Sequence, residues 1–243
     1  MSARFEEIDW RRTPMGEISL RRRWDPALGV QVYEVKLGDE FLMSSAFTEG
    51  EIALARLALA ELPGADLDVV VGGLGLGYTA QRVLEDARVR SLSVVEALGE
   101  VIEWHEGELL PLSPGLVADR RCRLVHGDFF ELVGSGMGLD PQVERRRFDG
   151  VLVDIDHSPR HVLHPRHAAF YRPEGLSRVA ECLHPGGVFA LWSNDPPDEE
   201  FGAVLTEVFA RHEAHVVEFD NPLQARKAAN TVYVARTAMT PDS

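Results

Sequence analysis

Acidic and glycine residues follow several apolar runs of this sequence, where they could bind a ligand or move a proton. The first group is a glycine-rich turn with Gly73, Gly75 and Gly77, between the apolar run 69–71 and a helical pattern. Glycines let the backbone approach a ligand closely, and a helix start offers unpaired N–H groups. Tight strand-to-helix turns also need glycine for steric reasons, so the turn alone does not identify a binding site.

Glu96 ends the next apolar run, about twenty residues after the glycines, as in nucleoside-binding βαβ units. An acidic side chain at that place accepts hydrogen bonds from ribose hydroxyls. The alternative is a solvated carboxylate at a strand end. With the glycine turn before it, we interpret Glu96 as a ligand for the ribose of a nucleoside.

Asp128 lies just beyond the following apolar run. Ligands of open parallel sheets bind outside the carboxyl ends of the strands, so we expect Asp128 beside Gly73 and Glu96. Asp128 is also suited to cap a helix that begins at Phe129, and the two roles can coexist.

Asp154 and Asp156 follow the fourth apolar run. Carboxylates there could hold a cationic amine and take its proton as a general base. Strand alternation would direct both side chains the same way, which favours a shared site. A structural role in the turn toward Ser158 and Pro159 applies more easily to Asp156 than to Asp154.

Four histidines follow these acids, and they raise the question of a metal site. They are His157, His161, His164 and His167. Two prolines interrupt any continuous helix, no cysteine joins the cluster, and the spacing matches no compact zinc pattern. We therefore expect surface or loop histidines and no metal.

The segments that must position these residues read as alternating strands and helices. Apolar runs at 68–73, 92–97, 122–128, 150–156 and 187–193 alternate with helical stretches. Such runs, without polar alternation, are typical of strands covered by helices on both faces. They predict an α/β fold with a doubly wound, mostly parallel Rossmann-like sheet. The last runs, 214–219 and 231–236, could form an antiparallel closing pair.

Residues 16–45 read as three extended segments separated by turns, which predicts a small N-terminal antiparallel β unit. Thr48 is a plausible N-cap, and Glu51 completes a capping box at the start of a helix. We therefore divide the chain into an N-terminal β-strand unit (1–47) and a nucleoside-binding catalytic domain (48–243).

Two further segments are assigned from their composition. Residues 134–147, with glycines, a proline and three consecutive arginines, are interpreted as an exposed loop. Phe170 and Tyr171 are expected to head a helix that reaches Leu183, and their rings are more often core than ligand contacts.

The chain has 243 residues, 45% hydrophobic, and a formal net charge of −14. This charge would repel phosphate backbones and anionic lipids, so we expect neither nucleic acid nor membrane as a partner, whereas a cationic polyamine would be attracted. The N-terminus lacks the apolar stretch of a secretory signal, which predicts a cytoplasmic protein. Cys122 and Cys182 are expected to be reduced, buried thiols.

In this order, these segments resemble the spermidine synthase family of aminopropyltransferases. The resemblance covers nearly the whole chain. It is carried by TPMGEISL and LGDEFLMSS, the glycine-rich turn, VVEA with Glu96, HGDFFEL, FDGVLVDIDHSP, AAFYRPEGLSRVAECLHPGGVFAL and NPLQARKAANTVYVAR. It implies a Rossmann fold of the S-adenosylmethionine-methyltransferase type behind a small N-terminal β-domain.

The resemblance also implies roles for single residues. Gly73 and Gly75 would border the nucleoside, Glu96 would bind the ribose, and Asp128 would contact the adenine. Asp154 matches the first acid of the family's DSSDP-like motif and would be the catalytic base. The family's donor is decarboxylated S-adenosylmethionine, its acceptor is a diamine, and its members commonly form dimers.

The sequence departs from the family pattern at three places. Gly75 stands where the family's GGGDGG motif carries an Asp that contacts the donor's aminopropyl end. His157 stands where the second acid of the DSSDP-like motif falls, with Asp156 adjacent. The usual Tyr and Gln of the acceptor entrance are missing from residues 48–59. An S-adenosylmethionine-dependent methyltransferase and a non-catalytic nucleoside-binding relative therefore stand as alternatives.

Overall fold

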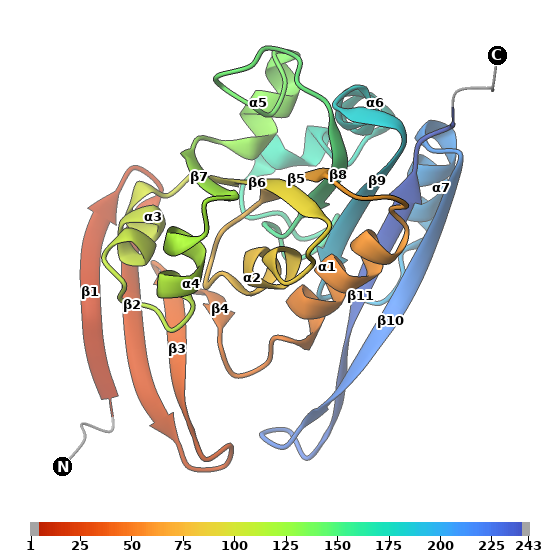
Figure 1. Cartoon of the computed structure of the whole chain (residues 1–243). Coiled ribbons are helices and arrows are strands. Elements are labelled where there is room, and N and C mark those ends of the chain that lie inside the picture. Colours follow the sequence, from red (N-terminus) through yellow and green to blue (C-terminus); the bar gives the residue numbers. More distant parts are fainter. Residues whose placement is uncertain (1–4, 240–243) are drawn as a thin grey trace.

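The computed structural model describes residues 5–239, which form two β-sheets and the helices around them (Figure 1). The strands are β1 (Phe5–Thr13), β2 (Gly16–Asp25), β3 (Val30–Leu37), β4 (Glu40–Ser44), β5 (Leu67–Gly72), β6 (Val89–Glu96), β7 (Cys122–His126), β8 (Phe148–Val153), β9 (Leu183–Ser193), β10 (Arg211–Asn221) and β11 (Arg226–Arg236). The helices are α1 (Glu49–Ala60), α2 (Tyr78–Leu84), α3 (Gly99–Glu106), α4 (Ser113–Ala118), α5 (Phe129–Ser135), the 3-10 helix η1 (Pro165–Ala169), α6 (Pro173–Glu181) and α7 (Glu199–Val208).

The larger sheet has seven strands in the order β10-β11-β9-β8-β5-β6-β7. The five strands from β9 to β7 are parallel, while β11 is antiparallel to β9 and β10 is antiparallel to β11. The fold is therefore the mostly parallel α/β sheet that the sequence predicts, and its two last strands form the antiparallel closing pair.

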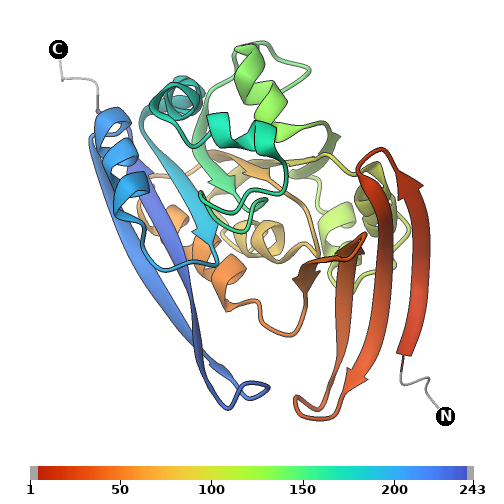
Figure 2. The same cartoon turned by 180° about the vertical axis from the view of Figure 1, so that it is seen from behind.

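Successive residues of the central strands belong to different cores, because strand side chains alternate between faces. Val69 and Val71 of β5 pack in one hydrophobic cluster with α1, α2, α3 and α4, whereas Val70 packs in a second cluster with α5, α6 and α7. Figure 1 shows α1 to α4 toward the viewer, and Figure 2 shows α5 to α7 from behind. Burial on both faces explains why these strands lack polar alternation.

The smaller sheet is antiparallel, in the order β1-β2-β3-β4, and lies beside α3 and α4 (Figure 1). Ile18, Leu20 and Val35 of this sheet are fully buried and belong to the same cluster as α1 to α4. The indole Nε1 of Trp104 on α3 donates a hydrogen bond of 2.6 Å to Oδ2 of Asp9 on β1. This packing accompanies the approach of Met43 on β4 to Gly75 in the turn after β5.

The structure corrects several expectations about single elements. Strand β1 was not predicted, because its charged, largely exposed residues give no apolar run. Helix α6 begins at Pro173 and ends at Glu181, so Phe170 and Tyr171 precede it, and both are buried as core residues. No side-chain hydrogen bond caps α1 at Thr48. The backbone N–H of Thr48 bonds to Glu49 instead, so the capping box with Glu51 is wrong.

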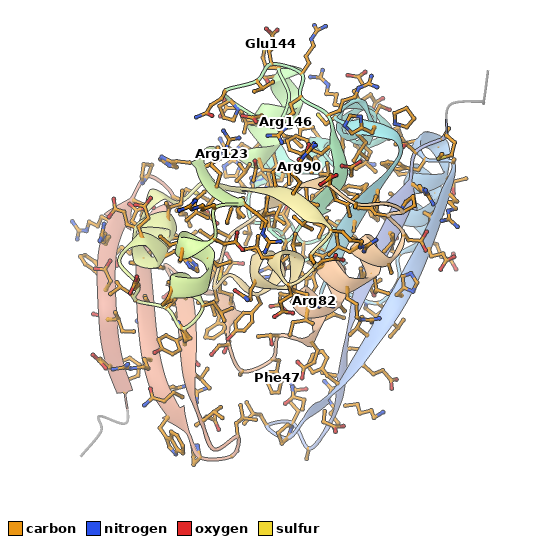
Figure 3. All side chains as sticks on the ribbon, in the orientation of Figure 1. Phe47, Arg82, Arg90, Arg123, Glu144 and Arg146 are labelled. Carbon is orange, nitrogen blue, oxygen red and sulfur yellow. The ribbon has the colours of Figure 1, made fainter. Side chains whose placement is uncertain are left out.

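The arginine-containing segment 134–147 is only partly the exposed loop expected. Asp140 is buried, and its carboxylate is paired with Arg123 and Arg146. Arg146 also approaches Asp68, which pairs with Arg90. Figure 3 shows Arg90, Arg123 and Arg146 near one another. Since Asp68 lies at the start of β5, this ionic network braces the amino ends of the strands.

Candidate functional site

A cavity of about 90 Å³ lies at the carboxyl ends of the parallel strands. Its lining includes five of the sequence-predicted site residues: Gly73, Gly75, Glu96, Asp128 and Asp154. Gly77 and Asp156 do not line it. The strand order β8-β5-β6-β7 places Asp154, Gly73, Glu96 and Asp128 in that sequence along the sheet edge.

Gly73 is required by the close approach of two strand ends. Its backbone has φ +94°, and a Cβ built on it would lie 2.1 Å from the backbone oxygen of Asp154. The two ends are joined by a hydrogen bond of 2.8 Å from the N–H of Asp154 to the carbonyl of Gly72. Only glycine combines this conformation with that spacing, so the turn sets the distance between β5 and Asp154.

The other two glycines of the turn have different surroundings. A Cβ on Gly75, whose φ is +50°, would lie 2.7 Å from the sulfur of Met43 on β4. Met43 therefore occupies the space beside the position where an aspartate was expected from the resemblance. A Cβ on Gly77 would meet His105 of α3 and Leu116 of α4. Gly77 thus serves helix packing and the start of α2.

Glu96 ends β6, and its carboxylate ties together two segments of the cavity wall. One oxygen accepts a hydrogen bond of 2.9 Å from the N–H of Leu74, and the other accepts 2.9 Å from the N–H of Leu98. Burial raises the pKa of the Glu96 carboxyl, while the hydrogen bonds from Leu98 and Leu74 lower it. The side chain is thus not the solvated carboxylate of the alternative interpretation.

Asp154 follows β8 and is held in place by one hydroxyl. The buried Thr79 donates a hydrogen bond of 2.7 Å from Oγ1 to Oδ2 of Asp154. Removal from water raises the pKa of Asp154 to about 6, against a smaller lowering effect of Thr79. A carboxylate of this kind can exchange a proton near neutral pH, as a general base must.

A second carboxylate, Glu51, lies near Asp154. It belongs to the first turn of α1, and Thr79 also approaches its backbone carbonyl at 3.4 Å. Burial, followed by the negative charge of Asp154, raises the pKa of Glu51 to about 8. Near pH 7 the pair therefore holds a proton on Glu51 and a charge on Asp154. Sequence reasoning missed this role because it assigned Glu51 to helix capping.

Asp156 points away from the cavity. Its carboxylate accepts hydrogen bonds from the N–H of Leu163, Nδ1 of His167 and the hydroxyl of Tyr171, at 2.7, 2.9 and 2.8 Å. The expected alternation with Asp154 is wrong because β8 ends at Val153, so no strand geometry governs the residues that follow. Asp156 instead organises the segment between β8 and α6.

Asp128 has two partners. Its Oδ1 accepts a hydrogen bond of 3.1 Å from the N–H of Glu131, which caps α5, and its Oδ2 is 2.7 Å from Nη2 of Arg166. The helix-capping alternative is thus confirmed. Arg166 also lines the cavity, so a cation from η1 lies at the end of the site beside Asp128.

The four clustered histidines have separate partners. His157 pairs with Glu40 at 3.0 Å and His161 with Asp195 at 2.8 Å. His167 pairs with Asp156, and Nδ1 of His164 accepts from the N–H of Arg166. Within residues 5–239, no group of three or more His, Cys, Asp or Glu side chains is arranged to hold a metal ion.

Several residues of the cavity wall were not predicted. They come from the smaller sheet and from the segments after β7 and β8: Met15, Leu37, Leu42, Met43, Phe130, Leu163 and His167. None of them follows a strand of the parallel sheet directly, so the carboxyl-end rule that finds Glu96 and Asp154 gives no signal for them. Most of these side chains are apolar, so the cavity suits a partly apolar ligand.

Comparisons with known proteins identify the fold. No family model matches the sequence. The spermidine synthase from Thermotoga maritima is 18% identical, with a TM-score of 0.71 over 97% of this chain and 74% of that chain. A spermidine synthase in complex with the transition state analogue AdoDATO is 18% identical, with a TM-score of 0.73 over 97% of this chain and 75% of that chain. The chain therefore has the fold of spermidine synthases, as expected from the resemblance.

In the described part of the chain, no helix has the length and apolar character to span a membrane.

Proposed function

We propose that this protein is a spermidine synthase-like aminopropyltransferase. It would move an aminopropyl group from decarboxylated S-adenosylmethionine to an amine acceptor and release 5′-methylthioadenosine. The observation that carries the proposal is the convergence of Gly73, Glu96 and Asp154 on one cavity, with Asp154 held by Thr79 at 2.7 Å. The AdoDATO complex of a spermidine synthase with the same fold supports a nucleoside donor.

The cavity fits the chemistry of such a donor. Gly73 lets the backbone approach the ligand, Glu96 offers carboxylate oxygens at the ribose position, and Phe130 offers an aromatic face beyond it. The donor, when bound, supplies a methylene carbon activated by a positively charged sulfur. Near neutral pH the protein offers the negative charge of Asp154 at this edge, which favours a cationic sulfonium and a cationic amine.

In the proposed reaction, Asp154 takes a proton from the ammonium group of the acceptor. The nitrogen lone pair then attacks the methylene carbon beside the sulfonium, the carbon–sulfur bond breaks, and its electron pair remains on the now neutral sulfur. Such a displacement needs mainly positioning and desolvation. Thr79 supplies the positioning by directing one oxygen of Asp154, and the partial burial of Asp154 supplies a pKa of about 6.

A methyltransferase is the second candidate, and one contact favours it. Gly75 lacks the acidic side chain that would meet the aminopropyl end of a decarboxylated donor, and Met43 lies where that side chain would extend. Intact S-adenosylmethionine would then be the donor and S-adenosylhomocysteine the product. A non-catalytic relative would bind the nucleoside without turnover.

A thermal-shift comparison of four nucleosides separates these proposals. A ligand at about 100 times its dissociation constant adds about 2.7 kcal/mol of stability. Larger shifts with decarboxylated S-adenosylmethionine and 5′-methylthioadenosine are expected for aminopropyl transfer. Larger shifts with S-adenosylmethionine and S-adenosylhomocysteine would favour the methyltransferase, and no shift with any of the four would contradict a nucleoside site.

A further inference from the structure

His167 lies in the cavity wall although nearly all of its surface is buried. The side chain follows the loop after β8, on η1, and is 4% exposed. Its ring stacks on Phe130, with 4.0 Å between ring centroids and 27° between planes. Both rings line the cavity, so together they form an aromatic layer at one end of the site.

Asp156 fixes which nitrogen of His167 carries a proton. The Nδ1 of His167 lies 2.9 Å from Oδ1 of Asp156, which also accepts from Leu163, while Oδ2 accepts from Tyr171. A carboxylate facing Nδ1 requires a proton on that nitrogen, and in the neutral imidazole the other nitrogen is then a bare acceptor. No partner of Nε2 occurs among residues 5–239. His167 therefore has one unused hydrogen-bond acceptor on a ring that belongs to the cavity wall.

The position of this acceptor corresponds to the base of a bound nucleoside. Along the sheet edge, Asp154 marks the reacting end, Glu96 the ribose and Asp128 the far end. Phe130 and His167 lie at the far end with Asp128, since Phe130 follows Asp128 closely on α5 and Arg166 of η1 pairs with Asp128. Each oxygen of Asp128 already accepts one hydrogen bond. The imidazole Nε2 adds a neutral acceptor to this carboxylate.

We propose that His167 is a specificity-determining residue that recognises the 6-amino group of adenine through Nε2, and that Asp156 is the positioning residue that sets its tautomer. This inference rests on the proposed nucleoside site. An amino group can donate to Nε2, whereas the 6-oxo group of hypoxanthine would oppose one acceptor to another. The pair would thus select adenine nucleosides over their deaminated counterparts.

Binding measurements with a matched pair of ligands test this role without turnover. Calorimetric titration compares 5′-methylthioadenosine with 5′-methylthioinosine. The wild-type protein should bind the amino compound about tenfold or more tightly. The 6-amino group donates a hydrogen bond to Nε2, whereas the 6-oxo group would leave Nε2 without a donor. A 6-unsubstituted purine analogue should bind with intermediate affinity. Because all three ligands are compared on the wild-type protein, the result does not depend on whether a variant folds.

Variants then assign the preference to single residues. His167→Phe keeps an aromatic ring against Phe130 and should reduce the preference to less than about threefold. In Asp156→Asn, the amide oxygen accepts a hydrogen bond from Nδ1 of His167 less strongly than the carboxylate does. This variant should therefore reduce or reverse the preference. His184→Phe, at an exposed position of β9 outside the cavity wall, should leave the preference unchanged.

The outcomes separate this inference from the proposed function. An unchanged preference in a folded His167→Phe protein, or a wild-type preference for the 6-oxo compound, would overturn the role of His167 and leave the nucleoside site standing. Absence of binding by either nucleoside to the wild-type protein would overturn both.

Discussion

The hydroxyl of Thr79 on α2 donates a hydrogen bond of 2.7 Å to Oδ2 of Asp154, at the end of β8. Thr79 directly follows the glycine-rich turn and Tyr78, so the segment that would face the donor also orients the carboxylate that would face the acceptor. Because Gly73 packs against the backbone of Asp154, the two parts of the site are positioned by one local structure.

Replacing Asp154 by Asn should abolish the proposed general base and preserve the cavity. The amide oxygen can still accept from Thr79, so we expect kcat to fall about 10²- to 10⁴-fold while nucleoside affinity changes little. Steady-state kinetics together with calorimetric titration measure both. Asp220→Asn, on β10 and outside the cavity wall, is the matched control. A near-normal rate in Asp154→Asn would remove Asp154 from the mechanism.

The pH dependence of kcat/KM should fall on the acidic side near pH 6. The raised pKa of Asp154 means that the carboxylate is ionised above about pH 6 and becomes protonated, and inactive as a base, below it. The profile reports ionisations of the free enzyme, so a rate–pH series is sufficient. An acidic limb near pH 4, the ordinary range of an aspartate, would contradict this environment.

Glu51→Gln tests the carboxylate pair. Glu51 is still protonated while Asp154 titrates, so a neutral glutamine should not shift the acidic limb, which stays near pH 6. The ionisation of Glu51 near pH 8 should disappear. Conversely, Asp154→Asn should lower the pKa of Glu51, because the negative charge of Asp154, the second-largest cause of its elevation, is lost. Carbon-detected NMR of the side-chain carboxyls follows both, with exposed Glu106→Gln as the control. An unchanged pKa of Glu51 in Asp154→Asn would mean that the two groups do not interact.

Glu96→Gln should weaken both the cavity wall and nucleoside binding. Glutamine has one carbonyl oxygen, so either Leu74 or Leu98 loses its acceptor, and we expect a loss of about 1–3 kcal/mol in unfolding free energy. Urea denaturation measures this loss, and titration with 5′-methylthioadenosine under stabilising conditions measures binding. Full retention of affinity would exclude Glu96 as the ribose ligand.

Asp128 allows its capping role to be separated from its ion pair. Asparagine is an equally good N-cap, so Asp128→Asn should change unfolding free energy by less than about 0.5 kcal/mol, whereas Asp128→Ala should cost about 1 kcal/mol. The ion pair contributes little because Arg166 is largely exposed. Equal losses in both variants, measured by urea denaturation, would show instead that the pairing with Arg166 carries the stability.

The sequence was sufficient to predict the parallel sheet and the residues that directly follow its strands. Gly73, Glu96, Asp128 and Asp154 converge because the carboxyl ends of parallel strands meet at one edge. Asp156 was misplaced because the end of β8 at Val153 cannot be read from an apolar run that continues into acidic residues.

The remaining parts of the site depend on packing between segments far apart in the sequence. Met43 reaches Gly75 only because the smaller sheet packs beside α3 and α4. His167 reaches Phe130 only because Asp156 folds the segment after β8 back onto α5. Local patterns carry no information about such contacts, which is why Glu51 was assigned to a helix cap.

Product analysis tests the central claim most directly. The protein is incubated with decarboxylated S-adenosylmethionine and a panel of diamines, and the nucleoside products are identified by mass spectrometry beside a parallel incubation with S-adenosylmethionine. We predict 5′-methylthioadenosine in equal amount to an aminopropylated amine, dependent on the amine and lost in Asp154→Asn. Formation of S-adenosylhomocysteine from S-adenosylmethionine, or no product with any amine although the nucleoside binds, would contradict aminopropyl transfer.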